Sequence, residues 1–283
     1  MSAPDFQFSP GRYIAPAVDW LNTNLHGFFR ALSVIIETLL GGLESALQAL
    51  PPGVLIAIVV IAAAVAIRVR VALLAGLMLG FCLLAGLWAA TLQTVALVSV
   101  AVLISVAVAF PLGIVASKVK RFDAMVQPVL NVMQTVPPWV YLIPAVMIFS
   151  LGRVPAIIAT VVYGIPPMLR LTTLAFNGVP KNMLELGHAM GASNRAILFK
   201  IEIPLATPTL LVGLNQCILL SLAMVVLAGL VGAGGLGAEV TRGLTRMEMG
   251  LGLRAGLAIV AVALLLDRLS RGALDRRRKP SAR

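Results

Sequence analysis

The sequence predicts an all-α fold, a polytopic membrane helix bundle with about seven transmembrane helices. Of its 283 residues, 60% are hydrophobic and only 12% are charged, and the mean hydropathy is +1.00. A soluble domain has roughly 45–50% apolar and about 25% charged residues. With half the usual charge, this chain could not cover a water-exposed surface. The composition therefore excludes most soluble enzymes, nucleic-acid-binding modules and disordered proteins.

Residues 1–52 form a segment of their own ahead of the apolar stretches. Between about residues 17 and 50, apolar residues recur at helical spacing, and polar residues such as Glu37 and Glu44 fall between them. This pattern predicts one or two amphipathic helices that lie on the membrane interface, because the segment is too polar to span it. Pro51-Pro52 ends the segment. No cleavable signal peptide is expected, since no basic region followed by an apolar one is seen.

Seven apolar stretches follow, within residues 53–269. A spanning helix needs about 20 apolar residues, so the first stretch is short and the third is long. The fourth contains Pro137, Pro138 and Pro144 and is therefore predicted to be broken or kinked. The stretches lie at about Gly53–Arg68, Val71–Ala89, Leu92–Ser117, Val129–Leu151, Val154–Phe176, Pro208–Gly232 and Gly250–Asp267.

The basic residues predict the orientation of the bundle. If the seven stretches alternate across the membrane, 15 of the 22 Lys and Arg residues fall on one side and five on the other; Arg170 and Arg254 lie within spans. Because cytoplasmic loops carry the excess of basic residues, we expect the amino terminus outside and the carboxyl terminus in the cytoplasm. Residues 1–52 are then extracytoplasmic, and residues 270–283 form a basic cytoplasmic tail. This clustering also explains the net charge of +11 without nucleic-acid binding.

The chain offers little covalent chemistry. It has no Gly-Lys dipeptide for a P-loop, and its two histidines, His26 and His188, are far apart, so no metal pair is expected. All eleven acids fall in loops, terminal segments or span ends, whereas an ion-coupled carrier usually needs buried carboxylates. Deep polar groups such as Gln134, Asn215 and Gln216 are uncharged, and either hold helices together or line a translocation path. If the chain transports, its energy should come from another subunit.

The longest cytoplasmic loop, residues 178–205, is the sharpest local signal. Pro180 opens a short predicted helix, Gly191 gives a turn, and a second short helix runs to Pro204. The loop is either an ordinary solvated connector or, with its exposed apolar residues, a docking surface for a cytoplasmic partner.

That loop resembles the coupling-loop signature of permease subunits in binding-protein-dependent ABC importers. The family pattern is Glu-Ala-Ala, three residues, Gly, nine residues, then Ile-x-Leu-Pro. Glu185, Gly191, Ile201 and Pro204 match it at the right spacing, and Leu186, Gly187 and Ile203 depart from it.

Beyond the loop, the chain is similar to permeases of glycine betaine, proline betaine and choline importers. This likeness rests on residues 134–172, 214–237, 242–252 and 264–271. It implies the type I ABC importer permease fold in a bacterial inner membrane. It also implies a second permease copy, as in a homodimer, two cytoplasmic ATPase subunits that carry ATP and Mg, and an extracytoplasmic solute-binding protein. This chain itself is expected to hold no cofactor; the alternative function is a stand-alone secondary carrier or channel for osmolytes.

Two groups of candidate functional residues follow from these observations. The second group contains prolines, a tryptophan and glycines that are candidates for a gate. The alternatives for them are a structural kink, an interfacial tryptophan and a flexible glycine loop. Arg170 either reaches lipid headgroups or contacts the cytoplasmic loop. The ATPase-coupling group is Glu185, Leu186, Gly187, Gly191, Ala192, Ile201, Ile203 and Pro204. The translocation or gate group is Gln134, Pro137, Pro138, Trp139, Asn215, Gln216, Gly234 and Gly235.

Overall fold

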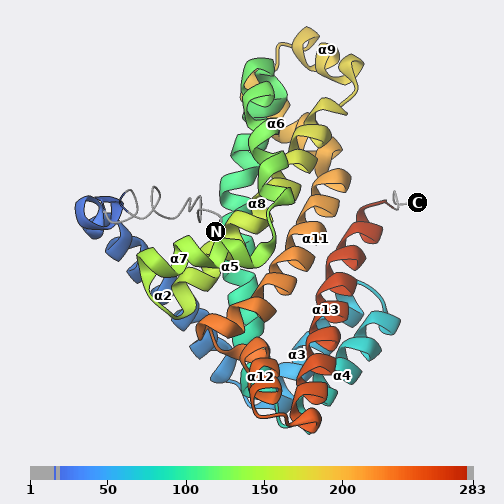
Figure 1. Ribbon diagram of the computed structural model, residues 1–283. Helices are drawn as coiled ribbons and strands as arrows, with labels where there is room; N and C mark the ends of the chain where they lie inside the picture. Colours follow the sequence, from blue (N-terminus) through green and yellow to red (C-terminus); the bar gives the residue numbers. More distant parts are fainter. Residues whose placement is uncertain (1–15, 17–19, 279–283) are drawn as a thin grey trace, which may run out of the picture.

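The computed structural model describes residues 16 and 20–278, with side chains as far as residue 272. Within that part of the chain every regular element is a helix, which confirms the predicted all-α fold. The helices form an elongated bundle with α9 at one end and α12 at the other (Figure 1).

Three long helices form the centre of the bundle: α5 (Trp88–Lys118), α8 (Arg153–Asn177) and α11 (Ile203–Ala228). α8 packs along both of the others and is the most buried of the long helices. Glycines let the backbones approach: a Cβ on Gly113 of α5 would lie 2.5 Å from Cβ of Thr172, and one on Gly164 of α8 would lie 3.1 Å from Sγ of Cys217. Small residues at helix contacts are typical of bundles in lipid, where association depends on close packing.

The other helices flank this centre. α13 (Met249–Arg278) packs on α11, on α12 (Gly235–Thr245) and on α4 (Val69–Leu84). α3 (Pro52–Ala66) forms a hairpin with α4, and α2 (His26–Gln48) lies against α5 and α8. An ion pair of 2.7 Å between Glu44 and Arg153 ties α2 to the start of α8.

The seven predicted stretches all become helical, but they differ in length. Within the described residues, five helices are long and apolar enough to cross a membrane, or six if a bent pair counts as one span. α3 and α4, the first two stretches, have 15 and 16 residues, or roughly 22–24 Å at 1.5 Å per residue, which is less than the ~30 Å hydrocarbon core. α2 is one of the five, although its polar residues led us to expect an interfacial helix.

The bent pair is the predicted broken stretch. α6 (Lys120–Thr135) and the segment of η1 (Pro138–Tyr141) and α7 (Leu142–Phe149) meet at 108°. Two consecutive prolines cause this break, because Pro137 and Pro138 lack the N–H that would continue α6. Val136 is extended, with φ −69° and ψ 128°, as a residue before proline prefers.

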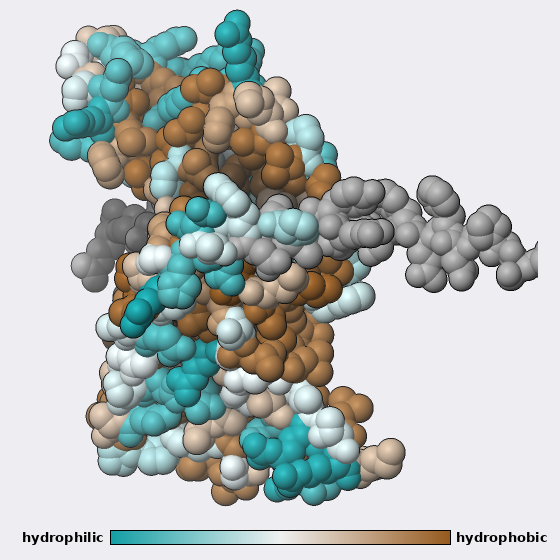
Figure 2. Space-filling model, turned by 60° about the vertical axis from the view of Figure 1, so that its left-hand side comes forward, coloured by the Kyte–Doolittle hydropathy of each residue, from teal (hydrophilic) through white to brown (hydrophobic). Residues whose placement is uncertain are grey.

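Hydrophilic side chains gather at the upper end of the molecule, where α9 lies (Figure 2). Below it the same face is mixed, with hydrophilic side chains through its middle and at its lower end and hydrophobic side chains between and beside them. The cytoplasmic loop of the sequence prediction is therefore a polar tip.

Candidate functional site: the loop tip, the bend and the glycine turn

The backbone at Gly191 ends α9 (Lys181–Ala189). Gly191 has φ +75°, and its N–H donates to the carbonyl of His188 over 2.9 Å. The N–H of Ala192 donates to the carbonyl of Gly187 over 3.0 Å. These two bonds form a Schellman cap, in which the left-handed residue is usually glycine because it has no Cβ. The predicted turn at Gly191 is therefore present, with a conformational reason for glycine.

The second predicted short helix is continuous with the membrane helix that follows it. Ser193 caps α10 (Asn194–Ile197) by accepting a 3.3 Å hydrogen bond from the N–H of Ala196. A five-residue π-helix, η2 (Leu198–Glu202), then leads directly into α11, and Pro204 lies in the first turn of α11. The loop is thus a helix, a glycine turn and the extended foot of α11, with Ile201 in η2 and Ile203 at the start of α11.

α9 packs against this foot at Gly187. Gly187 is buried, and a Cβ there would lie 2.8 Å from Cδ1 of Ile201 and 3.2 Å from Cγ1 of Ile197. The close approach explains why glycine stands where the family pattern has alanine. Glu185 and Leu186 are exposed on the same helix.

Large apolar side chains are exposed at this polar tip. Met183, Leu186, Met190 and Phe199 all lie at the surface, and Leu186 is 56% exposed. Exposed apolar side chains rimmed by polar ones are a candidate protein-binding surface. We refer to these four residues as the tip surface.

At the bend, Arg170 of α8 joins α6. Its guanidinium donates to Oε1 of Gln134 over 2.7 Å and also to Oδ1 of Asn131. The two alternatives considered for Arg170, lipid headgroups and the cytoplasmic loop, are thus replaced by a contact with the last turn of α6. Pro137 and Pro138 lie at the break that follows, and Trp139 is exposed beside it.

Asn215 and Gln216 are neighbours in α11 with different surroundings. Asn215 is buried; its Nδ2 donates to Oδ1 of Asp267 over 3.1 Å, and its Oδ1 accepts from Oγ of Ser270. Arg271 donates to the same Asp267 oxygen over 2.7 Å. These bonds tie α11 to α13. Gln216 is exposed on another face of α11.

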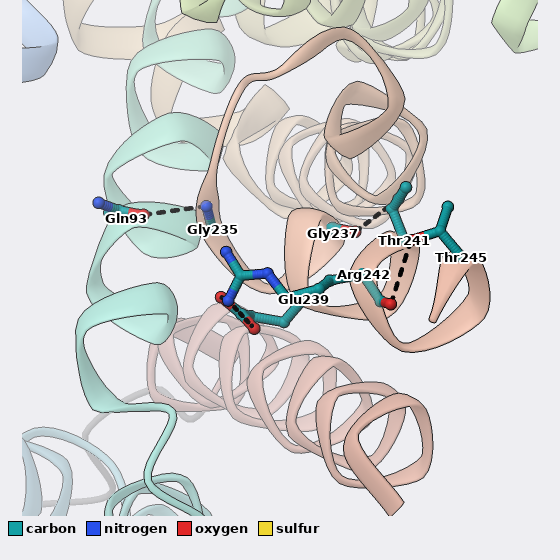
Figure 3. Close-up of polar contacts among 7 residues, drawn as sticks. All are labelled: Gln93, Gly235, Gly237, Glu239, Thr241, Arg242 and Thr245. Atoms are coloured by element: carbon teal, nitrogen blue, oxygen red, sulfur yellow. Dashed lines mark hydrogen bonds and ion pairs between the residues drawn. The ribbon is translucent and has the colours of Figure 1, made fainter. Parts of the chain in front are cut away.

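The glycine turn holds the first turn of α12 against α5. The N–H of Gly235 donates to Oε1 of Gln93 over 2.9 Å (Figure 3), and that of Leu236 donates to Oγ1 of Thr94 over 2.8 Å. Side chains of α5 thus satisfy N–H groups that a helix start leaves free. Gly234 and Gly235 have φ of +81° and +69°. The segment is an ordered close turn.

The turn also packs backbone against backbone. A Cβ on Gly229, at the end of α11, would overlap the backbone of Gly237 in α12. Within α12, Glu239 and Arg242 form an ion pair of 3.0 Å (Figure 3).

The predicted residues therefore fall into separate places. The coupling group gathers at the tip, and the glycine turn lies at the opposite end of the bundle (Figure 1). Among the described residues, no three His, Cys, Asp or Glu side chains lie close enough to hold a metal ion. The ion pair between Lys118 and Glu202 was not predicted from the sequence. The feature that indicates it is a pair of opposite charges at the ends of two apolar stretches.

A family comparison decides the class of the chain. Residues 109–280 match the family model described as a binding-protein-dependent transport system inner membrane component. The chain belongs to this family. It is thus an inner membrane component of a transport system.

Individual members of the family are similar along most of the chain. The glycine betaine transport system permease protein OpuAB of Bacillus subtilis is 41% identical, over 89% of this chain and 90% of that protein. The glycine betaine/proline betaine permease protein ProW of Escherichia coli is 37% identical, over 91% of this chain and 73% of that one. The glycine betaine/carnitine permease protein GbuB of Listeria monocytogenes is 35% identical, over 90% and 94%.

A solved structure shares the fold. An inward-facing form of the MetNI methionine ABC transporter superimposes with a TM-score of 0.61 at 20% identity, over 68% of this chain and 96% of that one. This likeness confirms the predicted type I permease fold. Family and fold together favour a transport permease over a stand-alone carrier.

Proposed function

We propose that this permease forms the translocation path of an ATP-driven importer for quaternary-amine osmolytes such as glycine betaine, proline betaine or choline. The observation that carries the proposal is the 41% identity with a glycine betaine permease over 89% of the chain. The tip supports the proposal in two ways. α9 presents exposed apolar side chains, and the foot on which α9 packs is continuous with the membrane helix α11.

The tip surface is the docking site of a separate ATPase in this proposal. Glu185 to Gly191 would occupy a groove of that subunit, which holds ATP and Mg. Closure of its nucleotide sites then moves α9, and the contact of Gly187 with Ile201 passes the movement to α11. ATP supplies free energy here only by favouring one conformation over the other.

The remaining partners follow from the proposed orientation. In the proposed orientation α2 lies along the membrane surface, although it is long and apolar enough to cross. Residues 1–52 and α12 are then on the extracytoplasmic side, toward the binding protein, and the tip and residues 270–283 are on the cytoplasmic side. Lys118, Lys120 and Lys181 are exposed at the ends of α5, α6 and α9, and Lys200 is exposed in η2. Such an excess of basic residues is typical of cytoplasmic loops. A second copy of the chain completes the path, and the exposed amide of Gln216 in α11 suits that interior better than lipid.

The path itself binds its cargo weakly. Quaternary ammonium ions are best held by aromatic cages, whereas only 6% of this chain is aromatic. Selection therefore rests on the binding protein, and the bend from Gln134 to Trp139 and the turn at Gly234 and Gly235 act as gates. Asn215 supports the path by holding α13 to α11.

Reconstitution in proteoliposomes tests this function. The chain, its ATPase and its binding protein are expected to accumulate radiolabelled glycine betaine only when all three and ATP are present. Uptake by this chain alone would contradict the proposal and favour a stand-alone carrier.

A further inference from the structure

Glu202 is a buried carboxylate that the coupling group does not include. It is the last residue of η2, at the foot of α11, and its side chain is only 4% exposed. A charged carboxylate is costly to bury unless a partner of opposite charge compensates it. A carboxylate at this position therefore needs a specific partner.

That partner is Lys118, the last residue of α5. Nζ of Lys118 forms an ion pair with Oε1 of Glu202 across 84 positions of sequence. Both residues lie at joints between helices: Val119, with φ −121° and ψ 96°, separates α5 from α6, and the π-helix η2 joins α10 to α11. π-Helical turns are rare and are frequent at functional sites.

One backbone hydrogen bond is missing at this joint. Pro204, two residues after Glu202, has no N–H and cannot donate a hydrogen bond back into η2, whereas the N–H of Ile203 donates to the carbonyl of Leu198. Side chains tie the foot of α11 to other helices: Ile197 and Ile201 contact α9 at Gly187, and Glu202 contacts α5. A continuous set of contacts thus runs from α9 through η2 to Lys118.

The far end of α5 holds the glycine turn. Gln93 and Thr94, near its start, bind the first N–H groups of α12. The 31-residue helix therefore connects the two candidate regions, and about 25 residues separate Gln93 from Lys118, roughly 38 Å at 1.5 Å per residue.

We propose that Lys118 and Glu202 are positioning residues that link movement of α9 to α5, and through α5 to the glycine turn at the opposite end. The inference rests on the proposed function, because it assumes that an ATPase moves α9. If η2 shifts with α9, the ion pair makes the end of α5 follow it. Without the pair, α9 and η2 move while α5 stays behind. ATP hydrolysis is then no longer matched by opening of the path.

Charge variants of the reconstituted importer test this link. E202Q removes the carboxylate charge at constant shape, K118M removes the ammonium, and K118E/E202K exchanges the two charges. K120M is the matched control, because Lys120 is exposed and forms no ion pair among the described residues. Co-purification with the ATPase checks that each variant assembles. Glycine betaine uptake and ATP hydrolysis stimulated by the binding protein are then measured together.

A distant readout separates linkage from plain stability. Thr245 is exposed on α12, and both native cysteines are buried, so T245C gives a single reactive thiol. Its labelling rate is measured with and without ATP. In the wild-type background we expect ATP to change this rate severalfold, and in E202Q and K118M we expect no change.

We expect E202Q and K118M to assemble but to lose at least tenfold in uptake per ATP hydrolysed. The charge exchange should restore at least a third of the wild-type ratio, and K120M should match wild type. The inference is wrong if the single variants keep the wild-type ratio, if they keep the ATP-dependent change in labelling, or if the exchange is no better than either single variant. Absence of ATP-driven uptake by the wild-type complex would instead contradict the proposed function.

Discussion

A single backbone angle at Gly191 decides how α9 ends. At φ +75° only glycine avoids a clash of Cβ with its own backbone, and the two hydrogen bonds of the cap depend on this angle. A side chain there costs roughly 1–2 kcal/mol, most for a β-branched residue. The direction in which the chain leaves α9 toward η2 would change with it.

The variant G191V is therefore expected to insert into the membrane normally but to lose glycine betaine uptake and stimulated ATP hydrolysis by at least tenfold. Both are measured on the reconstituted complex. G250A is the matched control, since a Cβ on Gly250 meets no atom within 4 Å and the backbone there is not left-handed. Normal uptake by G191V would contradict the role given to the turn.

Sequence reasoning succeeded for local residues and failed for distant pairs. The spacing from Glu185 to Pro204 predicted the first helix, the turn and a second short helix, because all of them depend on neighbours in sequence. It did not predict that the second helix runs without a break into α11. The contacts of Glu202 with Lys118 and of Arg170 with Gln134 join positions 84 and 36 residues apart. Only the packing of α5, α6, α8 and α11 brings them together, and no local pattern encodes that packing.

At the scale of elements, the break between α6 and η1 depends on a bridge to α8 as well as on prolines. The prolines forbid a straight helix, as the sequence predicted, but they do not fix the angle. Arg170 adds two charge-assisted hydrogen bonds between α8 and the last turn of α6. These bonds hold the end of α6, where the bend begins, against α8.

We expect R170M to lower the thermal midpoint of the purified chain by several degrees, because each lost bond contributes about 1 kcal/mol at a partly exposed site. Q134A should lower it less, since the bond to Asn131 remains. The double variant R170M/Q134A should resemble R170M alone, and a scanning thermal assay in detergent measures all three. Strictly additive effects would show that the two side chains act independently.

The whole molecule has two functional ends joined by long helices, and its orientation sets which end meets which partner. The sequence predicted seven spanning stretches, whereas α3 and α4 are too short to cross alone, because apolar composition does not reveal where a helix ends. If α3 and α4 do not cross, Arg68 and Arg70 leave the cytoplasmic side, and 13 basic residues remain there, which still favours the same orientation.

Surface labelling of intact cells tests the orientation. M190C at the tip and T245C on α12 each add an exposed thiol to a chain whose native cysteines are buried. We expect a membrane-impermeant maleimide to label T245C directly and M190C only after permeabilisation. The reverse pattern would place the tip outside and overturn the proposed topology.

Cross-linking from the tip to the ATPase tests the central claim most directly. Leu186 is 56% exposed on α9, and Leu244 is 73% exposed on α12 at the other end of the bundle. Each is replaced by cysteine carrying a short photoactivatable cross-linker in the assembled complex. The account predicts an adduct between the L186C chain and the ATPase subunit, with none from L244C. An adduct from L244C, or none from L186C in a complex that takes up glycine betaine, would contradict it.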